Sequence, residues 1–86
     1  MVKPKHIPHE LADEFPDETA LIARLAETNH LFRQLAGRYD EANRQIFQIE
    51  SGEAPTADEV LERLKKQRLK LKDEIARMLT RVERRM

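Results

Sequence analysis

The chain lacks cysteine and tryptophan, and it contains only two glycines in 86 residues. Without cysteine, no disulfide, thiolate nucleophile or cysteine-ligated zinc site can form. Aromatic residues make up 5% of the chain and charged residues 37%, a composition that is typical of long helices and coiled coils rather than of sheets. The sequence therefore predicts an all-α protein with a small core that no disulfide reinforces.

Long apolar runs are also missing. No segment approaches the roughly 20 apolar residues that span a bilayer, and the N-terminus, MVKPKHIPH, lacks the apolar core of a signal peptide. We therefore expect a cytoplasmic protein without membrane contact. The formal net charge is zero. Residues 1–56 nevertheless hold six basic and ten acidic residues, a net −4, and residues 57–86 hold ten and six, a net +4, so the two halves are electrically complementary.

The N-terminal third predicts short elements separated by proline. Residues 1–8 are expected to form a flexible arm, because they contain two prolines and no apolar periodicity. From residue 9 to the end we expect a single helical domain. Residues 9–14 can form one or two helical turns, with Pro8 at the first helical position, that end before Pro16. A short helix is expected next, from about 17 to 28.

Apolar residues at alternating spacings of three and four predict two long helices, at about 30–51 and about 57–84. The turn between them, residues 52–56, is short enough to make them antiparallel neighbours. Their common seam is predicted to consist of Phe32, Leu35, Tyr39, Ala42, Ile46, Ile49, Leu61, Leu64, Arg68, Leu71, Ile75, Met78 and Val82. The predicted fold class is an antiparallel two-helix hairpin, coiled-coil-like, preceded by a short N-terminal helix.

Capping signals indicate where these helices end. Asn29 is an N-cap candidate, so we expect a break there in preference to one continuous helix. Gly52 follows the last periodic residue and is the expected C-terminal stop, and Thr56 with Glu59 fits a capping box. The three-four spacing of the first long helix also continues upstream of the break, through Leu21, Leu25 and Thr28.

A bare hairpin of this size is not expected to be stable, because its apolar seam contributes less than the conformational entropy that folding removes. Either the N-terminal helix folds back over the seam, or two or more hairpins associate. We expect a homo-oligomer that associates through the seam. Leu69 lies on the back of the second long helix, where it is either an isolated exposed leucine or part of a second contact surface.

The stretch LKKQRLKLKDEI at residues 64–75 is rich in cations. On a helical wheel Arg68 falls inside the seam, where its guanidinium must reach solvent or meet a polar partner that fixes the helix register. Lys65 and Lys72 flank the seam and are expected to pair with acids of the facing helix such as Asp40 or Glu41. The other cations form an outward basic stripe, defined as Arg63, Lys66, Lys70, Arg77, Arg81 and Arg84.

The basic stripe has three interpretations. It is expected mainly to be a solvated face, with ion pairs to residues four positions earlier, namely Glu59 with Arg63, Glu62 with Lys66 and Asp73 with Arg77. The alternatives are contact with nucleic acid, which would be strongly salt-dependent, and contact with an acidic protein partner. No aromatic residue interleaves with the cations to stack on bases, which disfavours nucleic acid without excluding it.

Catalytic chemistry is not indicated. The sequence has no glycine-rich phosphate loop and no nucleophile beside a base, so we expect no enzyme activity, no cofactor and no small-molecule substrate. His6 and His9 have a spacing that could ligate a metal, but no second ligand pair accompanies them, and no metal site is predicted.

Several ordered motifs resemble the YdcH family of small bacterial proteins. They are EFP at 14–16, the pattern that runs from Phe32 through Tyr39-Asp40, Asn43, Ile46 and Ile49-Glu50 to Gly52, and LKKQRLKLKDEI at 64–75. The resemblance covers roughly residues 11–79. One departure is Ala26, where many relatives carry lysine. The resemblance implies a cytoplasmic bacterial helical hairpin, and it carries no catalytic or cofactor residue over to this chain.

Overall fold

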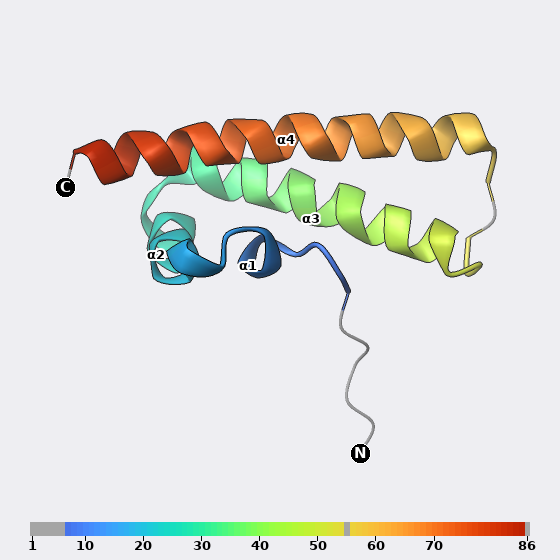
Figure 1. Cartoon of the computed structure of the whole chain (residues 1–86), viewed down its shortest axis with the longest axis horizontal. Helices are drawn as coiled ribbons and strands as arrows, with labels where there is room; N and C mark the ends of the chain where they lie inside the picture. Colours follow the sequence, from blue (N-terminus) through green and yellow to red (C-terminus); the bar gives the residue numbers. More distant parts are fainter. Residues whose placement is uncertain (1–6, 55, 86) are drawn as a thin grey trace, which may run out of the picture.

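The computed structural model describes residues 7–54 and 56–85. In these ranges the chain is helical and contains no strand, with α1 at Leu11–Glu14, a 3₁₀ helix at Pro16–Glu18, α2 at Thr19–Thr28, α3 at His30–Glu50 and α4 at Asp58–Arg84. The two long helices, α3 and α4, lie side by side and antiparallel, and the N-terminal elements pack beneath them at the end away from the connecting loop (Figure 1). The predicted fold class is confirmed. Residues 1–6 of the predicted arm lie outside the described residues.

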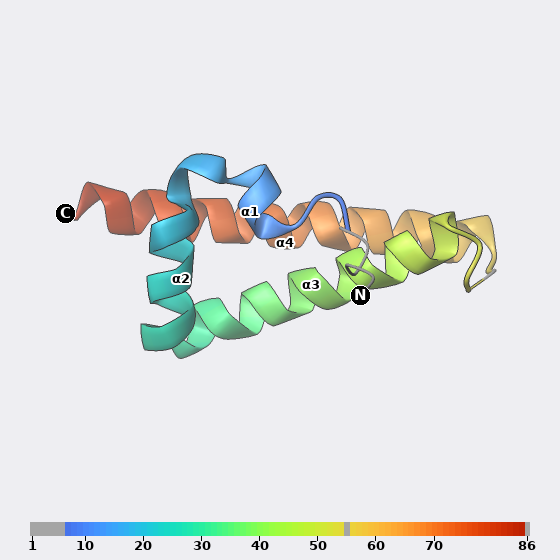
Figure 2. The same cartoon turned by 90° about the horizontal axis from the view of Figure 1, so that it is seen from below.

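The chain changes direction at Asn29, between α2 and α3. Asn29 has extended backbone angles, φ −125° and ψ 111°, and its side-chain Oδ1 accepts a hydrogen bond of 2.9 Å from the backbone N–H of Phe32. This bond satisfies one of the free amides of the first turn of α3. The predicted break and N-cap are confirmed, and Figure 2 shows α2 crossing the hairpin at a steep angle to α3.

The core forms where the N-terminal elements fold back against the hairpin. Its buried residues come from α1, α2, α3 and α4, and they are Leu11, Leu21, Leu25, Phe32, Leu35, Tyr39, Leu71, Ile75 and Leu79. The N-terminal elements therefore fold back over the seam, as the first of the two alternatives predicted. Leu79, which is only 2% exposed, was not in the predicted seam. The added N-terminal layer gives α4 a wider apolar contact face than a two-helix seam would require.

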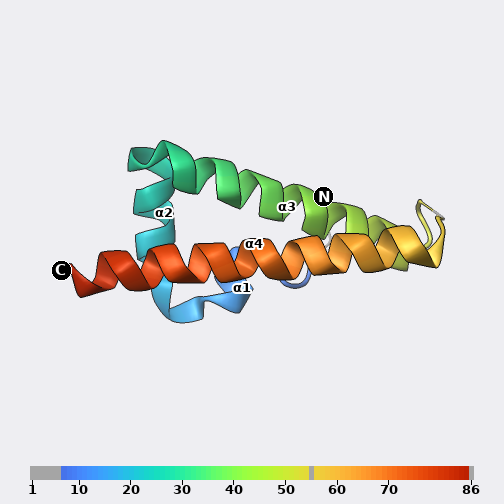
Figure 3. The same cartoon turned by 90° about the horizontal axis from the view of Figure 1, so that it is seen from above.

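The seam is buried unevenly along its length. Tyr39 and Ile75 are fully buried beside the N-terminal layer. Toward the loop Ile46 is still only 1% exposed, but Leu61 and Leu64 are half-buried. Ile49, also near the loop, is half-buried too. Met78 and Val82 of the predicted seam lie near the other end of α4, where they are half-buried and pack against the core. Figure 3 shows that α3 and α4 run on to the loop beyond the reach of α1 and α2.

The other predicted helix ends give one confirmed and two wrong predictions. Gly52 follows α3 with φ 83°, and its N–H donates to the carbonyl oxygen of Ile49 at 3.1 Å, as expected for a glycine stop. The predicted capping box of Thr56 and Glu59 is wrong, because the N-cap residue of α4 is Ala57 and no side chain caps the helix. α1 begins at Leu11, so Pro8 is not its first residue. No helix in the described ranges is long and apolar enough to cross a membrane.

Candidate functional site

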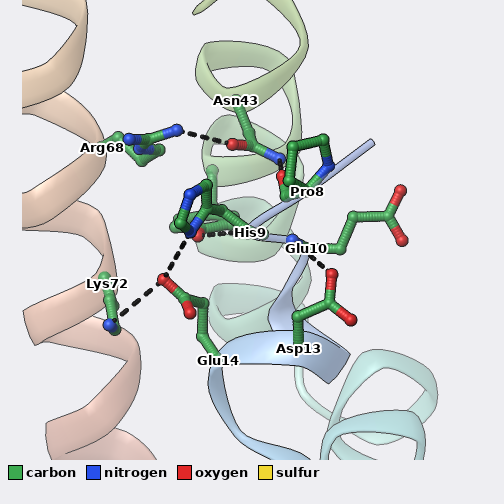
Figure 4. Close-up of polar contacts among 9 residues, drawn as sticks. Pro8, His9, Glu10, Asp13, Glu14, Asn43, Arg68 and Lys72 are labelled. Carbon is green, nitrogen blue, oxygen red and sulfur yellow. Dashed lines mark hydrogen bonds and ion pairs between the residues drawn. The ribbon is translucent and has the colours of Figure 1, made fainter. Parts of the chain in front are cut away.

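A cluster of polar contacts fastens the N-terminal segment to both long helices (Figure 4). We call it the polar clasp, and it consists of Pro8, His9, Glu14, Tyr39, Asn43, Arg68 and Lys72. At its centre Asn43, which is 3% exposed, uses both ends of its amide. Its Oδ1 accepts from Nη1 of Arg68 at 2.9 Å, and its Nδ2 donates to the backbone carbonyl of Pro8 at 3.0 Å.

Arg68 therefore has a polar partner inside the seam. Of the two interpretations of this residue, the polar contact between the two long helices is the one observed. Since a buried amide satisfied on both sides is stabilising and an unsatisfied one is costly, the contact favours one alignment of α3 with α4. It also joins that alignment to the position of the N-terminal segment.

Tyr39 forms the second contact of the clasp. Its hydroxyl donates to the backbone carbonyl of His9, one residue after the carbonyl that Asn43 holds. His9 has a left-handed φ of 64°. The backbone therefore turns at the point where the adjacent carbonyls of Pro8 and His9 accept hydrogen bonds from side chains of α3. Burial, and next the negative charge of Glu14, raise the pKa of the Tyr39 phenol to about 12, because both disfavour the phenolate.

Glu14 forms the third contact, with α4. Its Oε1 lies 3.2 Å from Nζ of Lys72 and 3.5 Å from Nδ1 of His9. The predicted pairing of Lys72 with Asp40 or Glu41 is wrong. For Lys65 the expected pairing with an acid of the facing helix is confirmed, because its Nζ lies 3.2 Å from Oε2 of Glu50 at the end of α3.

Asp40 and Glu41 have other surroundings. Burial, and next the charge of Glu10, raise the pKa of the Asp40 carboxyl. Glu41 accepts hydrogen bonds from Arg44 and Gln45, and these bonds lower the pKa of its carboxyl. Both acids therefore lie on α3 without reaching the flanking lysines of α4.

The polar clasp fixes the N-terminal segment against α3 and α4, and its groups are not arranged as in a catalytic site. Its polar groups bind backbone carbonyls or one another, and they do not form a nucleophile, base and orienting group in sequence. Among the residues that the structure describes, no group of three or more His, Asp or Glu could hold a metal ion. Of the two histidines considered as metal ligands, His9 contacts Glu14, whereas His6 lies outside the described residues.

The basic stripe is exposed along the outer face of α4, as the helical wheel predicted. All six of its side chains are exposed. The predicted ion pairs with Glu59, Glu62 and Asp73 do not form, since none of the three acids lies within 4.0 Å of a stripe cation in the ion pairs of the described chain. Near the C-terminus the stripe borders a shallow concavity of about 500 Å³ lined by Ala76, Arg77, Thr80, Arg81, Arg84 and Arg85.

The loop end of the hairpin carries a second surface feature, which we call the hairpin end. It is a groove of about 280 Å³ between the last turns of α3, the loop and the first turns of α4. Its lining includes the half-buried apolar residues Ile49, Val60 and Leu64. Leu61 on the first turns of α4 is also half-buried, so apolar surface remains accessible here.

Sequence reasoning missed four members of the clasp as contact residues, namely Pro8, His9, Glu14 and Asn43. One available signal was a polar residue next to Ala42 of the seam, on the helix that faces Arg68. A seam arginine needs a polar partner, and Asn43 was the candidate nearest the seam. The Glu14 contact spans 58 residues, and no local pattern points to it.

Comparison with models of protein families gives a match over the hairpin. A family model described as "Protein of unknown function (DUF465)" matches residues 32–79. No curated protein and no solved structure matches the chain. The matched range contains the hairpin members of the clasp, Tyr39, Asn43, Arg68 and Lys72, and it begins after the N-terminal segment that they hold.

Proposed function

The chain belongs to the DUF465 family of proteins of unknown function, which includes the YdcH proteins, and from this premise we propose that it is a small non-enzymatic interaction module of the cytoplasm that self-associates through the hairpin end. The observation that carries the proposal is the uneven burial of the seam. Ile46 is buried, yet Ile49, Leu61 and Leu64 beyond it remain half-buried. Apolar side chains on one contiguous surface favour association, because covering them removes apolar area from water.

A second copy of the chain is the proposed occupant. Charge supports this choice, because the first 56 residues carry a net −4 and the remaining 30 a net +4. Two copies related by a two-fold axis present the same patch to each other, and an arrangement that sets α3 of one copy, from the acidic part of the sequence, against α4 of the other, from the basic part, brings opposite charges together. Such complementarity favours correct pairing more than it adds affinity.

The mass in solution, measured by light scattering at micromolar concentrations, tests the proposal. We expect a dimer or higher oligomer for the wild type. Leu64→Lys introduces a charge into the hairpin end and should shift the protein to monomer while its helical circular dichroism is kept. Leu69→Lys is the matched control, because Leu69 lies on α4 and is 60% exposed. A wild type that stays monomeric, or an assembly that survives Leu64→Lys, would rule out this surface.

Nucleic-acid binding through the basic stripe is the second candidate function. The observation that favours it is that six exposed cations follow one face of α4 without ion-pair partners in the described residues. A surface of this kind can neutralise phosphates and release counterions. Arg85 beside the concavity would add to it.

Titration with mixed-sequence RNA at low and moderate salt tests this candidate. The double variant Arg77→Gln/Arg81→Gln should weaken binding and reduce the slope of log affinity against log salt by about 0.7 for each phosphate that the protein no longer neutralises. Arg33→Gln, which removes an exposed cation from α3, should change neither. Absence of binding at low salt ends this candidate. An acidic protein that competes with RNA for the same side chains would instead assign the stripe to a protein partner.

A further inference from the structure

We propose that the N-terminal segment, residues 7–28, exchanges between two copies of the chain, with Asn29 as the hinge. In the exchanged dimer each hairpin is covered by the segment of the other copy. The contacts that fix the segment in the single chain are then made between chains. This inference goes beyond the proposed function, because it requires no contact at the hairpin end.

The hinge is a single residue between two helices of matching register. α2 ends at Thr28 and α3 begins at His30, so Asn29 alone is non-helical. If Asn29 adopts helical angles, residues 19–50 become one helix. The apolar spacing already suits that helix, because it alternates between four and three across the break, at Leu21, Leu25, Thr28, Phe32, Leu35, Tyr39, Ala42, Ile46 and Ile49.

The straight helix has a cost that only a second copy offsets. Leu21 and Leu25 are buried when α2 folds back, and straightening α2 carries them away from their own hairpin. They must then be covered elsewhere, since burying a leucine contributes roughly 1.5–3 kcal/mol. The vacated surface on a second hairpin has the matching shape. This is the condition under which an element exchanges between identical chains.

The polar clasp supports exchange because it recognises the segment through groups that are the same in either arrangement. Tyr39 and Asn43 hold the backbone carbonyls of His9 and Pro8, and Lys72 holds the carboxylate of Glu14. All three contacts run from the hairpin to the segment. None of them depends on the peptide connection through Asn29, so a segment from a second copy satisfies them equally.

Leu31 is the second observation at the hinge. It lies two residues after Asn29 on α3 and is 58% exposed, one of two large apolar side chains that the described chain leaves this accessible. In an exchanged dimer the two straightened helices pass each other near their hinges. The exposed leucine then has a partner surface, which it lacks in the single chain.

Cross-linking between introduced cysteines tests the proposal directly, because the natural chain has no cysteine. Glu10 of the segment and Arg44 of α3 line one pocket of about 300 Å³, and neither belongs to the clasp. The full-length variant Glu10→Cys/Arg44→Cys is separated by size, and each fraction is treated with a short bismaleimide. We expect the monomer to become cross-linked within the chain and the dimer to give covalently joined chains. A dimer whose links lie only within chains overturns the proposal.

Variants at the hinge give an independent measurement. Asn29→Ala removes the cap to Phe32 and favours a continuous helix, and it should tighten dimerisation at least about tenfold, because the cap is removed once in each of the two chains. Asn29→Ser retains a capping oxygen and should leave the dimerisation constant near that of the wild type. Leu31→Lys should weaken the dimer and leave the monomer folded. If Asn29→Ala gives no more dimer than Asn29→Ser, the hinge is wrongly assigned.

The same cross-linking in a Leu64→Lys background separates this proposal from association at the hairpin end. Links between chains that persist in this background support exchange, whatever the hairpin end does. A different result would overturn exchange. If no dimer forms in the Leu64→Lys background, and the dimer without that substitution shows links within chains only, association takes place at the hairpin end.

Discussion

Nη1 of Arg68 on α4 lies 2.9 Å from Oδ1 of Asn43 on α3, and the amide of Asn43 holds the carbonyl of Pro8 on its other side. One buried asparagine thus links three segments that are distant in the sequence. A slip of one turn between α3 and α4 would separate Arg68 from this amide. It would leave a guanidinium in an apolar seam, which is costly.

Removing both partners of this contact should destabilise the fold by less than the sum of the two single losses. Asn43→Leu leaves Arg68 and the Pro8 carbonyl without a partner, and we expect a loss of about 1–3 kcal/mol in the free energy of unfolding. Arg68→Met should also destabilise. The double variant fills the seam with apolar side chains and should lose less than the sum of the two, with a coupling of about 0.5–3 kcal/mol. Urea unfolding followed by circular dichroism measures all three.

Gln34→Leu is the control for these variants, because Gln34 is exposed on the same helix and its replacement should change stability by less than about 0.5 kcal/mol. Strict additivity of the two seam variants would mean that Arg68 and Asn43 do not act together.

The pKa of the Tyr39 phenol should lie well above that of an ordinary tyrosine. It is the only tyrosine and the chain has no tryptophan, so the ultraviolet absorbance of phenolate reports this residue alone. We expect a pKa of about 12 in the folded protein and about 10 in urea. Because the folded-state pKa is the higher one, this group contributes its stability in full below about pH 10, and the contribution is lost as the pH rises toward 12.

Tyr39→Phe removes the hydroxyl that donates to His9. The variant should be less stable at neutral pH by about 1 kcal/mol, and its stability should fall less steeply than that of the wild type between pH 10 and 12. A phenolate that appears at pH 10 without unfolding would contradict the buried hydrogen bond.

The sequence was sufficient for features that depend on local periodicity. The three-four spacing predicted both long helices, the short turn between them predicted their antiparallel pairing, and the side chain of Asn29 predicted the break before α3. The helical wheel correctly placed the basic stripe outward, because a helix fixes the direction of each side chain from its position alone.

Features that depend on a third layer could not be predicted. Leu79 becomes core only because α1 and α2 widen the buried face of α4. The partner of Lys72 is Glu14, on an element whose position the sequence pattern does not define. The predicted ion pairs between residues four positions apart, such as Glu59 with Arg63, do not form for a different reason. Such exposed pairs contribute only a few tenths of a kcal/mol, and water competes for both groups.

Two leucines on α4 should respond very differently to truncation. Leu79 is 2% exposed and Leu69 is 60% exposed. Leu79→Ala opens a cavity between α4 and the N-terminal layer, and we expect a loss of about 2–5 kcal/mol. Leu69→Ala should stay within about 0.5 kcal/mol of the wild type. Thermal or urea unfolding of the two variants checks this, and equal losses would show that the N-terminal layer does not cover Leu79 in solution.

Replacing the two glycines by alanine should change the free energy of unfolding in opposite directions. Gly52 has φ 83°, a conformation that costs an L-residue roughly 1–2 kcal/mol, so Gly52→Ala should destabilise the hairpin by about that amount. Gly37 lies in the middle of α3 with nothing within 4 Å of an added Cβ. Gly37→Ala should therefore stabilise by about 0.5–1 kcal/mol, because alanine loses less backbone entropy in a helix. Both substitutions add one methyl group, so comparing their unfolding free energies isolates the backbone conformation. A stabilised Gly52→Ala variant would mean that the turn after α3 is not left-handed.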